Sequence, residues 1–353
     1  MTVLVQAEQN HGTLDEKLER LDTLLRSMGR VLIGYSGGVD SAMLAMAAHR
    51  VLGENAIAVT ADSESYATGE LEAASDITHR FGIRHVVVRT AELDNPEYAS
   101  NPTNRCYFCK QELFTHMQRL AGEMKVEHIL YGQNADDAGD FRPGAQAASD
   151  YGVRAPLMEA GLTKADVREL ARRWEVPVWN RPAMACLSSR FPYGTAITAA
   201  GLRMVDQAEK YLRQCGYTQL RVRHHVDLAR IELLAADLDQ LLKHPALRAQ
   251  IAAAFAGFGY QHITADLRGF RSGSMNEVLL PAAARAEETL GQARQALASL
   301  GPCELEAREQ MLCLRLEEQA MLALADQTRR QALVVRLEDL GFRYLALDLN
   351  PLD

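Results

Sequence analysis

The chain has 353 residues and a formal net charge of −8 at pH 7. This length allows a substantial buried core and suggests two or three domains, and the acidic balance provides no general attraction to nucleic acid. No apolar run approaches the length needed to span a bilayer, and no basic stretch followed by an apolar one opens the sequence. We therefore expect a cytoplasmic protein without a membrane or nucleic-acid partner, in which the six cysteines are thiols or metal ligands rather than disulfides.

Strand-like and helical patterns alternate through the first half of the chain. Leucines at helical spacing predict an amphipathic helix over 14–28, after a frayed tail at 1–10. Short apolar strands are expected at 31–33, 56–60, 85–89 and 128–131, with helices over 42–52, 69–81 and 112–121 between them and a further helix over 163–176. Strands joined through helices run parallel, so this order predicts an α/β fold with a mostly parallel, doubly wound sheet.

The loop after the first strand carries a specific motif. It reads SGGVDS, with Ser36, Gly37, Gly38, Asp40 and Ser41 between a strand and a helix. Glycines let backbone N–H groups approach an anion, and the start of a helix favours negative charge. The spacing differs from the GxxxxGK[ST] loop and closely resembles the pyrophosphate loop of the PP-loop ATP pyrophosphatases. That resemblance implies that ATP is split between its α and β phosphates, with Asp40 holding Mg²⁺; a glycine-rich turn without a ligand is the alternative.

Two more polar loops follow strands at the same expected edge, where parallel sheets bind ligands. They read ADS after the second strand and GQNADDAGDFRPG after the fourth. The candidates are Asp62, Ser63, Gly132 and Asn134 for ATP, Asp136 and Asp137 for Mg²⁺, and Arg142 for a phosphate or carboxylate. The alternative for the second loop is an acidic, solvated surface segment.

Three of the cysteines lie in polar loops. Cys106 and Cys109 form a CxxC pair in a loop that opens a helix, and Cys186 lies in the loop MACLSSRFPYG. The remaining cysteines form no second CxxC, which disfavours a closed Cys₄ zinc site. Three thiolates would hold a [4Fe-4S] cluster and leave one iron open, whereas a redox pair or two unliganded thiols remain alternatives for the pair alone. Ser189 and Arg190, after Cys186, could clamp a phosphate or belong to a plain surface loop.

Taken together, six segments identify a family. SGGVDS, TADS, NRCYFCK, YGQNADD, MACLSSRFPYG and GFRSGSMNE, within residues 14–277, resemble LarE, the ATP-dependent sulfur-insertion enzymes of nickel-pincer nucleotide synthesis. The resemblance implies that a carboxylate of pyridinium-3,5-biscarboxylic acid mononucleotide is adenylylated, releasing pyrophosphate, and that sulfur then displaces AMP. By matching motif, the substrate's phosphate and carboxylates would be bound by Lys110, Ser189, Arg190, Arg221 and Arg223, with Glu209 and Glu232 as candidates for metal or substrate contacts.

The family also implies a source of sulfur. One form sacrifices its own cysteine, and the other uses three cysteines that hold a [4Fe-4S] cluster whose open iron carries a sulfide. Cys106, Cys109 and Cys186 match the second form, with Cys186 as the expected sulfur source if no cluster forms. The alternatives are a PP-loop tRNA thiolase with the same cluster, which the acidic composition disfavours, and a non-catalytic cluster scaffold. We further expect a homo-oligomer, and the sulfide donor is left open.

The C-terminal part contains an internal repeat. The pattern around 220–232 recurs around 305–317 at a constant offset of 85 residues, and GYQHITADL at 259–267 resembles GFRYLALDL at 341–349. Each copy reads helix, strand, strand, helices, strand, so we expect domains at 1–193, 194–280 and 281–353, the last two being a duplicated α+β unit. Because Glu306 replaces Arg221 in the second copy, we expect residues 283–353 to be structural or to make subunit contacts, and their removal to spare the chemistry.

Overall fold

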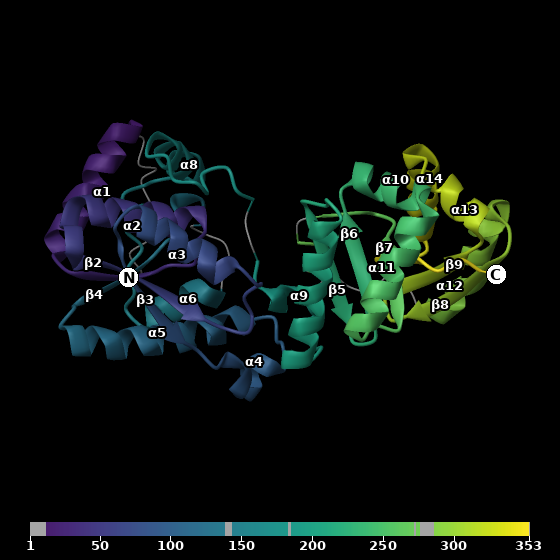
Figure 1. The fold of residues 1–353 in the computed structure, drawn as a ribbon, viewed down its shortest axis with the longest axis horizontal. Coiled ribbons are helices and arrows are strands. Elements are labelled where there is room, and N and C mark those ends of the chain that lie inside the picture. Colours follow the sequence, from purple (N-terminus) through teal and green to yellow (C-terminus); the bar gives the residue numbers. More distant parts are fainter. Residues whose placement is uncertain (1–11, 138–142, 183–184, 272, 276–285, 353) are drawn as a thin grey trace, which may run out of the picture. The chain divides into compact units, whose positions relative to one another are not determined.

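The computed structural model describes residues 12–137, 143–182, 185–271, 273–275 and 286–352. These residues form two compact units, 1–185 and 186–353, whose helices and strands are drawn in Figure 1. The expected tail at 1–10 lies outside the described residues. None of the helices described is both long and apolar enough to cross a membrane.

The N-terminal unit has the predicted alternation of strands and helices. In chain order its elements are α1 (Leu14–Met28), β1 (Val31–Gly34), α2 (Val39–Leu52), β2 (Ala56–Asp62), α3 (Glu70–Arg80), β3 (Arg84–Arg89), α4 (Pro96–Ala99), α5 (Arg105–Met124), β4 (His128–Tyr131), α6 (Pro143–Asp150), α7 (Pro156–Glu159) and α8 (Lys164–Arg173). Helix α5 begins earlier than predicted, so that its first two turns contain the CxxC pair expected in the preceding loop. No glycine or proline separates that pair from the rest of the helix.

The four strands form one parallel sheet in the order β3-β2-β1-β4. Alternate residues of β1 pack into different cores, since Val31 and Ile33 join α1, α2 and α8, whereas Leu32 joins α5 and α6. Helices therefore cover both faces, as Figure 1 shows for α2 and α5. This arrangement confirms the predicted doubly wound α/β fold and brings the loops after β1, β2 and β4 to one edge of the sheet.

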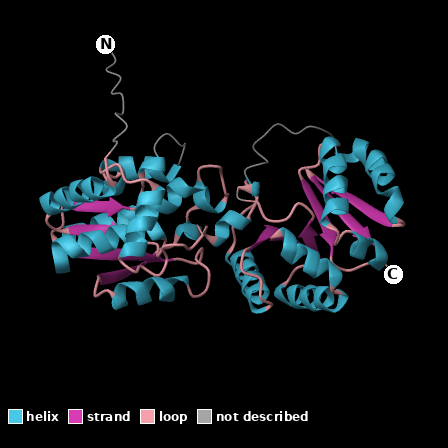
Figure 2. Ribbon diagram, turned by 90° about the horizontal axis from the view of Figure 1, so that it is seen from above, coloured by secondary structure: helices cyan, strands magenta, loops and turns pink. Residues whose placement is uncertain are grey.

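The C-terminal unit contains the same succession of elements in two copies. The first copy contains α9 (Ala199–Gln214), β5 (Leu220–His225), β6 (Leu228–Leu233), α10 (Ala235–Lys243), α11 (Pro245–Phe258) and β7 (His262–Asp266), and the second contains α12 (Ala286–Leu297), β8 (Cys303–Arg308), β9 (Met311–Leu316), α13 (Glu318–Ala323), α14 (Gln327–Asp339) and β10 (Tyr344–Asp348). This is the succession that the repeat predicts. Figure 2 shows these strands in magenta within the unit.

Both copies contribute to a single six-stranded sheet in the order β5-β6-β7-β10-β9-β8. The copies meet where β7 and β10 pair antiparallel, with Leu347 opposite Ala265. One apolar core contains residues of both copies, including Leu220, Ile231, Leu314 and Leu345, and the helices α9 to α14 pack against it. The two copies are therefore one folding unit rather than two separate layers.

Candidate active site

The SGGVDS loop forms a cradle at the start of α2. Gly37 has a φ of +73°, and a Cβ there would lie 3.0 Å from the Cβ of Ala74, so only glycine fits without strain. The hydroxyls of Ser36 and Ser41 lie 3.2 Å apart, and that of Ser41 donates to the Gly38 carbonyl at 3.0 Å. Gly38 is the N-cap of α2 and has no side chain to cap it, so N–H groups of the first turn remain for an anion.

A cavity of about 360 Å³ opens beside this cradle. Its lining includes eight residues that the sequence singled out, namely Ser36, Gly38, Asp40, Ser41, Cys106, Lys110, Gly132 and Asp137. Tyr66, Tyr131 and Gln133 also line it and had no sequence signal as ligands. Lys110 and Cys106 come from the first turns of α5, so the fold brings a cation and a thiol to the phosphate cradle from the opposite face of the sheet.

Asp40 is held from two sides inside the N-terminal unit. Its Oδ1 accepts a hydrogen bond from the side-chain amide of Asn134 at 3.3 Å, and its Oδ2 accepts one from the ammonium of Lys164. Lys164 opens α8, and its backbone N–H donates to Asp136 at 2.8 Å. Sequence reasoning missed Lys164, because a lysine after a helix cap gives no signal that its side chain will meet a carboxylate 124 residues away.

Asp62 and Ser63 lie at the end of β2 but not in the lining of this cavity. They border a second hollow of about 390 Å³ together with Arg89 and Glu92. The Ser63 hydroxyl donates to the buried carboxylate of Glu92, and that of Ser65 donates to the same oxygen at 3.1 Å. These two ATP candidates are therefore grouped with a buried acid rather than with the phosphate cradle.

The candidate metal ligands divide between the two units. Cys106 is exposed and Cys109 half-buried on α5, and Cys186 is half-buried in the C-terminal unit; all six cysteines are described, and none is in a disulfide. Among the residues that the structure describes, no three His, Cys, Asp or Glu side chains are arranged to hold a metal ion. The cluster and Mg²⁺ stay predictions, and Arg142 lies outside the described residues.

In the C-terminal unit, the loop after Cys186 is fastened by Arg190. Its guanidinium binds Glu209 with two parallel hydrogen bonds of 2.8 and 2.9 Å, and it donates to the Cys186 carbonyl at 2.9 Å and the Ser189 hydroxyl at 3.0 Å. Burial alone would raise the pKa of Glu209, but the charges of Arg190 and Arg213 outweigh it and lower that pKa. Glu209, a metal candidate in the sequence, is here a fully buried partner of guanidinium groups.

Arg221 and Arg223 lie on the same face of β5, as their alternation predicts. Arg223 is 5% exposed and donates to Glu232 at 2.8 Å and to the Ser189 carbonyl at 3.2 Å, while its Nε has no hydrogen-bond partner among the described residues. Burial lowers the pKa of Arg221 to about 10, and the nearby charge of Arg190 adds to this shift. An anion that accepts hydrogen bonds from Arg221 and Arg223 would give the buried Nε of Arg223 a partner. It would also reduce the repulsion between the guanidinium groups of Arg190 and Arg221.

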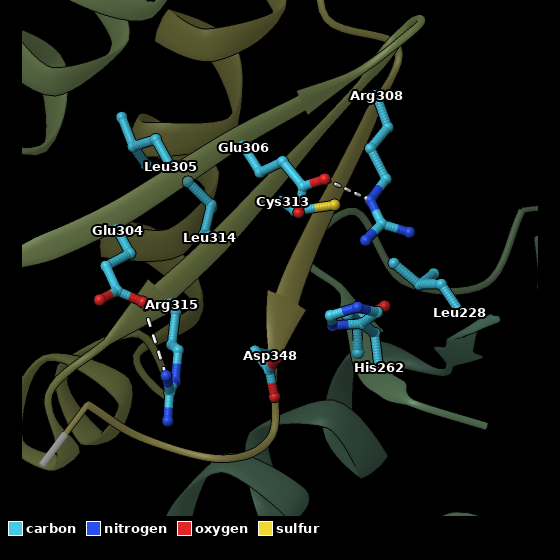
Figure 3. Close-up of a pocket in the computed structure, with 11 residues that line it drawn as sticks. Leu228, His262, Glu304, Leu305, Glu306, Arg308, Cys313, Leu314, Arg315 and Asp348 are labelled. Atoms are coloured by element: carbon cyan, nitrogen blue, oxygen red, sulfur yellow. Dashed lines mark hydrogen bonds and ion pairs between the residues drawn. The ribbon is translucent and has the colours of Figure 1, made fainter.

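A separate cavity of about 330 Å³ lies within the C-terminal unit between the two copies. Figure 3 shows Cys313 near its middle, with Glu306 and Arg308 to one side and Glu304 and Arg315 to the other. These arginines are paired with the glutamates at 2.8 and 3.5 Å. Burial raises the pKa of Cys313 to about 12, so its sulfur stays a thiol and is a poor nucleophile at neutral pH.

Comparison with known proteins relates this arrangement to one family. The NAD synthase family profile matches residues 16–102. An uncharacterized protein of Synechocystis is 46% identical over 266 residues, which cover 75% of this chain and 99% of that protein. Pyridinium-3,5-bisthiocarboxylic acid mononucleotide synthase of Lactiplantibacillus plantarum is 35% identical over 272 residues, 77% of this chain and 98% of the enzyme. An uncharacterized protein of Methanocaldococcus jannaschii is 23% identical over 243 residues, 69% of this chain and 91% of that protein.

The match covers nearly the whole length of the synthase. In this chain the SGGVDS cradle lies between the first strand and the helix that follows it. The chain belongs to the LarE family of PP-loop ATP-dependent sulfurtransferases.

Proposed function

We propose that the protein inserts sulfur into pyridinium-3,5-biscarboxylic acid mononucleotide at the expense of ATP. The observation that carries this proposal is the single cavity in which the SGGVDS cradle meets Cys106 and Lys110 of α5. The match to 98% of the length of a pyridinium-3,5-bisthiocarboxylic acid mononucleotide synthase, which covers 77% of this chain, supports the choice of substrate. Adenylylation and sulfur transfer both need the nucleotide phosphates and a sulfur source close together.

In the first step, a substrate carboxylate oxygen attacks the α phosphorus of ATP, and the bond to the β phosphate breaks. The leaving pyrophosphate would accept hydrogen bonds from Ser36, Ser41 and the first N–H groups of α2. Asp40 supplies the hard oxygen that suits Mg²⁺, and Lys164 and Asn134 keep that carboxylate oriented. Lys110 would neutralise charge on the phosphates or the substrate from the other wall of the cavity.

In the C-terminal unit, Arg221 and Arg223 would bind the substrate's phosphate or free carboxylate. Two observations support this assignment, since both favour a bound anion: Arg223 Nε has no hydrogen-bond partner among the residues that the structure describes, and burial together with the charge of Arg190 lowers the pKa of Arg221. Arg190 and Ser189 border the same group of side chains. Glu209 and Glu232 would act by orienting these guanidinium groups.

In the second step, sulfur attacks the activated acyl carbon, the bond to the AMP oxygen breaks, and AMP leaves. Cys106, Cys109 and Cys186 would hold a [4Fe-4S] cluster, and their thiol donor set suits that group. When bound, such a cluster supplies the sulfur atom that is transferred. Without a cluster, the Cys186 thiolate would itself displace AMP from the acyl carbon, and loss of the Cys186 α proton with cleavage of its Cβ–S bond would then leave the thiocarboxylate and a dehydroalanine, once per polypeptide.

Replacing Asp40 with alanine tests the ATP-splitting step. We expect the D40A variant to lose pyrophosphate release by about 100-fold or more, since the Mg²⁺ ligand is gone and Lys164 is left unpaired. Pyrophosphate is measured with ATP in the presence and absence of the pyridinium dicarboxylate nucleotide. Asp76→Ala, an exposed acid on α3, is the control and should retain activity. Undiminished, substrate-dependent release by D40A would refute the proposed role of the loop.

Replacing Cys186 with alanine tests the sulfur source. Iron, acid-labile sulfide and the visible spectrum are measured on anaerobically purified wild type and Cys186→Ala, with Cys215→Ala as the matched control. We expect about four irons per chain in wild type and control, and their loss in Cys186→Ala. Wild-type protein that contains no iron and takes up none on reconstitution would instead favour sacrifice of Cys186, with one sulfur transferred per chain.

A further inference from the structure

A tyrosine of the second copy contacts the buried charges of the first copy. Tyr344 opens β10, and the guanidinium of Arg230 on β6 lies over its ring at 4.0 Å from the centroid. The Tyr344 hydroxyl donates to the backbone carbonyl of Ser274 at 2.9 Å. Both contacts lie within the C-terminal unit, and Tyr344 is 3% exposed.

Arg230 and Ser274, two of the residues that Tyr344 contacts, lie beside the partners of Arg223. Arg230 donates to Glu232 at 3.0 Å, and Glu232 accepts from Arg223 at 2.8 Å. The Ser274 hydroxyl lies 2.9 Å from Nη2 of Arg223 and donates to Glu232 at 2.7 Å. Every step between Tyr344 and Arg223 is therefore a direct contact, along one route through Arg230 and another through Ser274.

The electrostatics make this chain of contacts sensitive to the tyrosine. Arg230, Glu232 and Asp266 are all fully buried, so no water can replace a lost partner. Burial raises the pKa of Asp266 despite its ion pair with Arg230, whereas the charges of Arg230 and Arg223 lower that of Glu232. Arg230 donates to both Glu232 and Asp266 and is one of the groups that hold Glu232 in place, and the ring of Tyr344 covers the face of Arg230.

Tyr344 belongs to the second copy, which begins after the last of the motifs that resemble the family. The Synechocystis and Lactiplantibacillus proteins are matched over 99% and 98% of their lengths, yet about a quarter of this chain has no counterpart in either. The family's motifs end at residue 277, before the whole second copy. The second copy therefore supplies a side chain to the network behind the candidate anion site.

We propose that Tyr344 is a positioning residue for substrate binding, acting through Arg230 and Ser274 to hold Arg223 in the geometry that binds the substrate's anionic group. This inference rests on the proposed function. On this proposal the second copy contributes to substrate binding in addition to its structural role.

The test compares three variants of the full-length chain. Tyr344→Leu removes the ring, Tyr344→Phe removes only the hydroxyl, and Leu345→Ala damages the same strand on its opposite face, where Leu345 is fully buried in the apolar core. KM for the pyridinium dicarboxylate nucleotide, KM for ATP, the dissociation constant of inorganic phosphate and thermal unfolding are measured for each.

For Tyr344→Leu we expect about a tenfold or greater rise in nucleotide KM and a parallel weakening of phosphate binding, with ATP KM unchanged because ATP binds in the N-terminal unit. Tyr344→Phe should show a smaller effect, about fivefold, since it loses one hydrogen bond. Leu345→Ala should lower the unfolding temperature at least as much as the tyrosine variants do, without changing the nucleotide KM or the phosphate dissociation constant.

The inference would be overturned if wild type and both tyrosine variants bound the nucleotide and phosphate equally well. It would also be overturned if Leu345→Ala lost as much affinity for these ligands as Tyr344→Leu. If Tyr344→Leu does not fold, Tyr344→Phe decides the question alone. Phosphate binding that depends on Tyr344, without turnover of the nucleotide by wild type, would refute the proposed function and support the inference. Wild type that binds neither ligand would refute the anion site and the inference together.

Discussion

Replacing Gly132 with alanine is expected to abolish substrate-dependent pyrophosphate release. Gly132 follows β4, and a Cβ there would lie 2.7 Å from the backbone nitrogen of Ser41, 2.8 Å from the carbonyl carbon of Asp40 and 2.9 Å from the Cα of Ser41. These are backbone atoms at the start of α2, so no side chain can rotate away to make room. The cradle itself would have to move by several tenths of an ångström.

On the proposal that the cradle positions the reacting phosphates, we expect G132A to lose about 100-fold or more in pyrophosphate release if it folds. ATP affinity, pyrophosphate release and the circular dichroism spectrum are measured together. Gly122→Ala is the matched control, since nothing lies within 4 Å of its Cβ position and alanine favours the helix α5. Normal activity in G132A would mean that the loop after β4 does not support the phosphate site.

Removing residues 283–353 is expected to unfold the C-terminal unit. The deletion removes β10 from its pairing with β7 and leaves β7 as an unprotected edge. It also takes many buried side chains from the shared core, among them Leu312, Leu314, Leu316, Met321, Leu345 and Leu347. Each such side chain contributes about 1.5–3 kcal/mol, so the loss from these six is as large as the roughly 5–15 kcal/mol of net stability that a domain typically has.

This expectation replaces the view from the sequence that the segment could be removed without affecting the chemistry. Near-ultraviolet circular dichroism, limited proteolysis and thermal unfolding of the truncated chain would show lost packing, cleavage within 194–280 and self-association through the exposed strand. Val335→Ala, on the exposed side of α14 in the second copy, is the control and should unfold like wild type. A truncated chain that keeps a cooperative transition for the first copy and full activity would contradict the shared core.

Much of the fold could be predicted because its signals are local. The apolar runs at β1, β2, β3 and β4 are short, bounded by polar segments and separated by helical patterns, so each strand and the parallel sheet followed from nearby residues. The cradle was predictable for the same reason, since glycines and hydroxyls in consecutive positions form it. The start of α5 was missed because the cysteines and aromatic residues of its first two turns carry no marked helical pattern.

The candidate site was only partly predictable, because its members are joined across long stretches of chain. The edge of the sheet brings Gly132 to the cradle as expected, whereas Asp62 and Ser63 border a different hollow beside Glu92. That Cys106 and Lys110 of α5 line the same cavity as the cradle was not predicted. The position of Asp62 and Ser63 after a strand was visible in the sequence. Which cavity Asp62 and Ser63 border depends on how the end of β2 packs against β3 and against the turn that follows β3.

The sequence by itself determined the α/β order, the phosphate cradle, the cysteine set and the duplicated C-terminal pattern of this protein. Only the tertiary structure decided that the two copies share one sheet, that Lys164 meets Asp40, and that Glu232 lies between Arg223 and Arg230. The physical reason is the range of the interactions involved. Turns, caps and periodic faces arise from neighbouring residues, whereas ion pairs and strand pairing between distant segments depend on how whole elements pack.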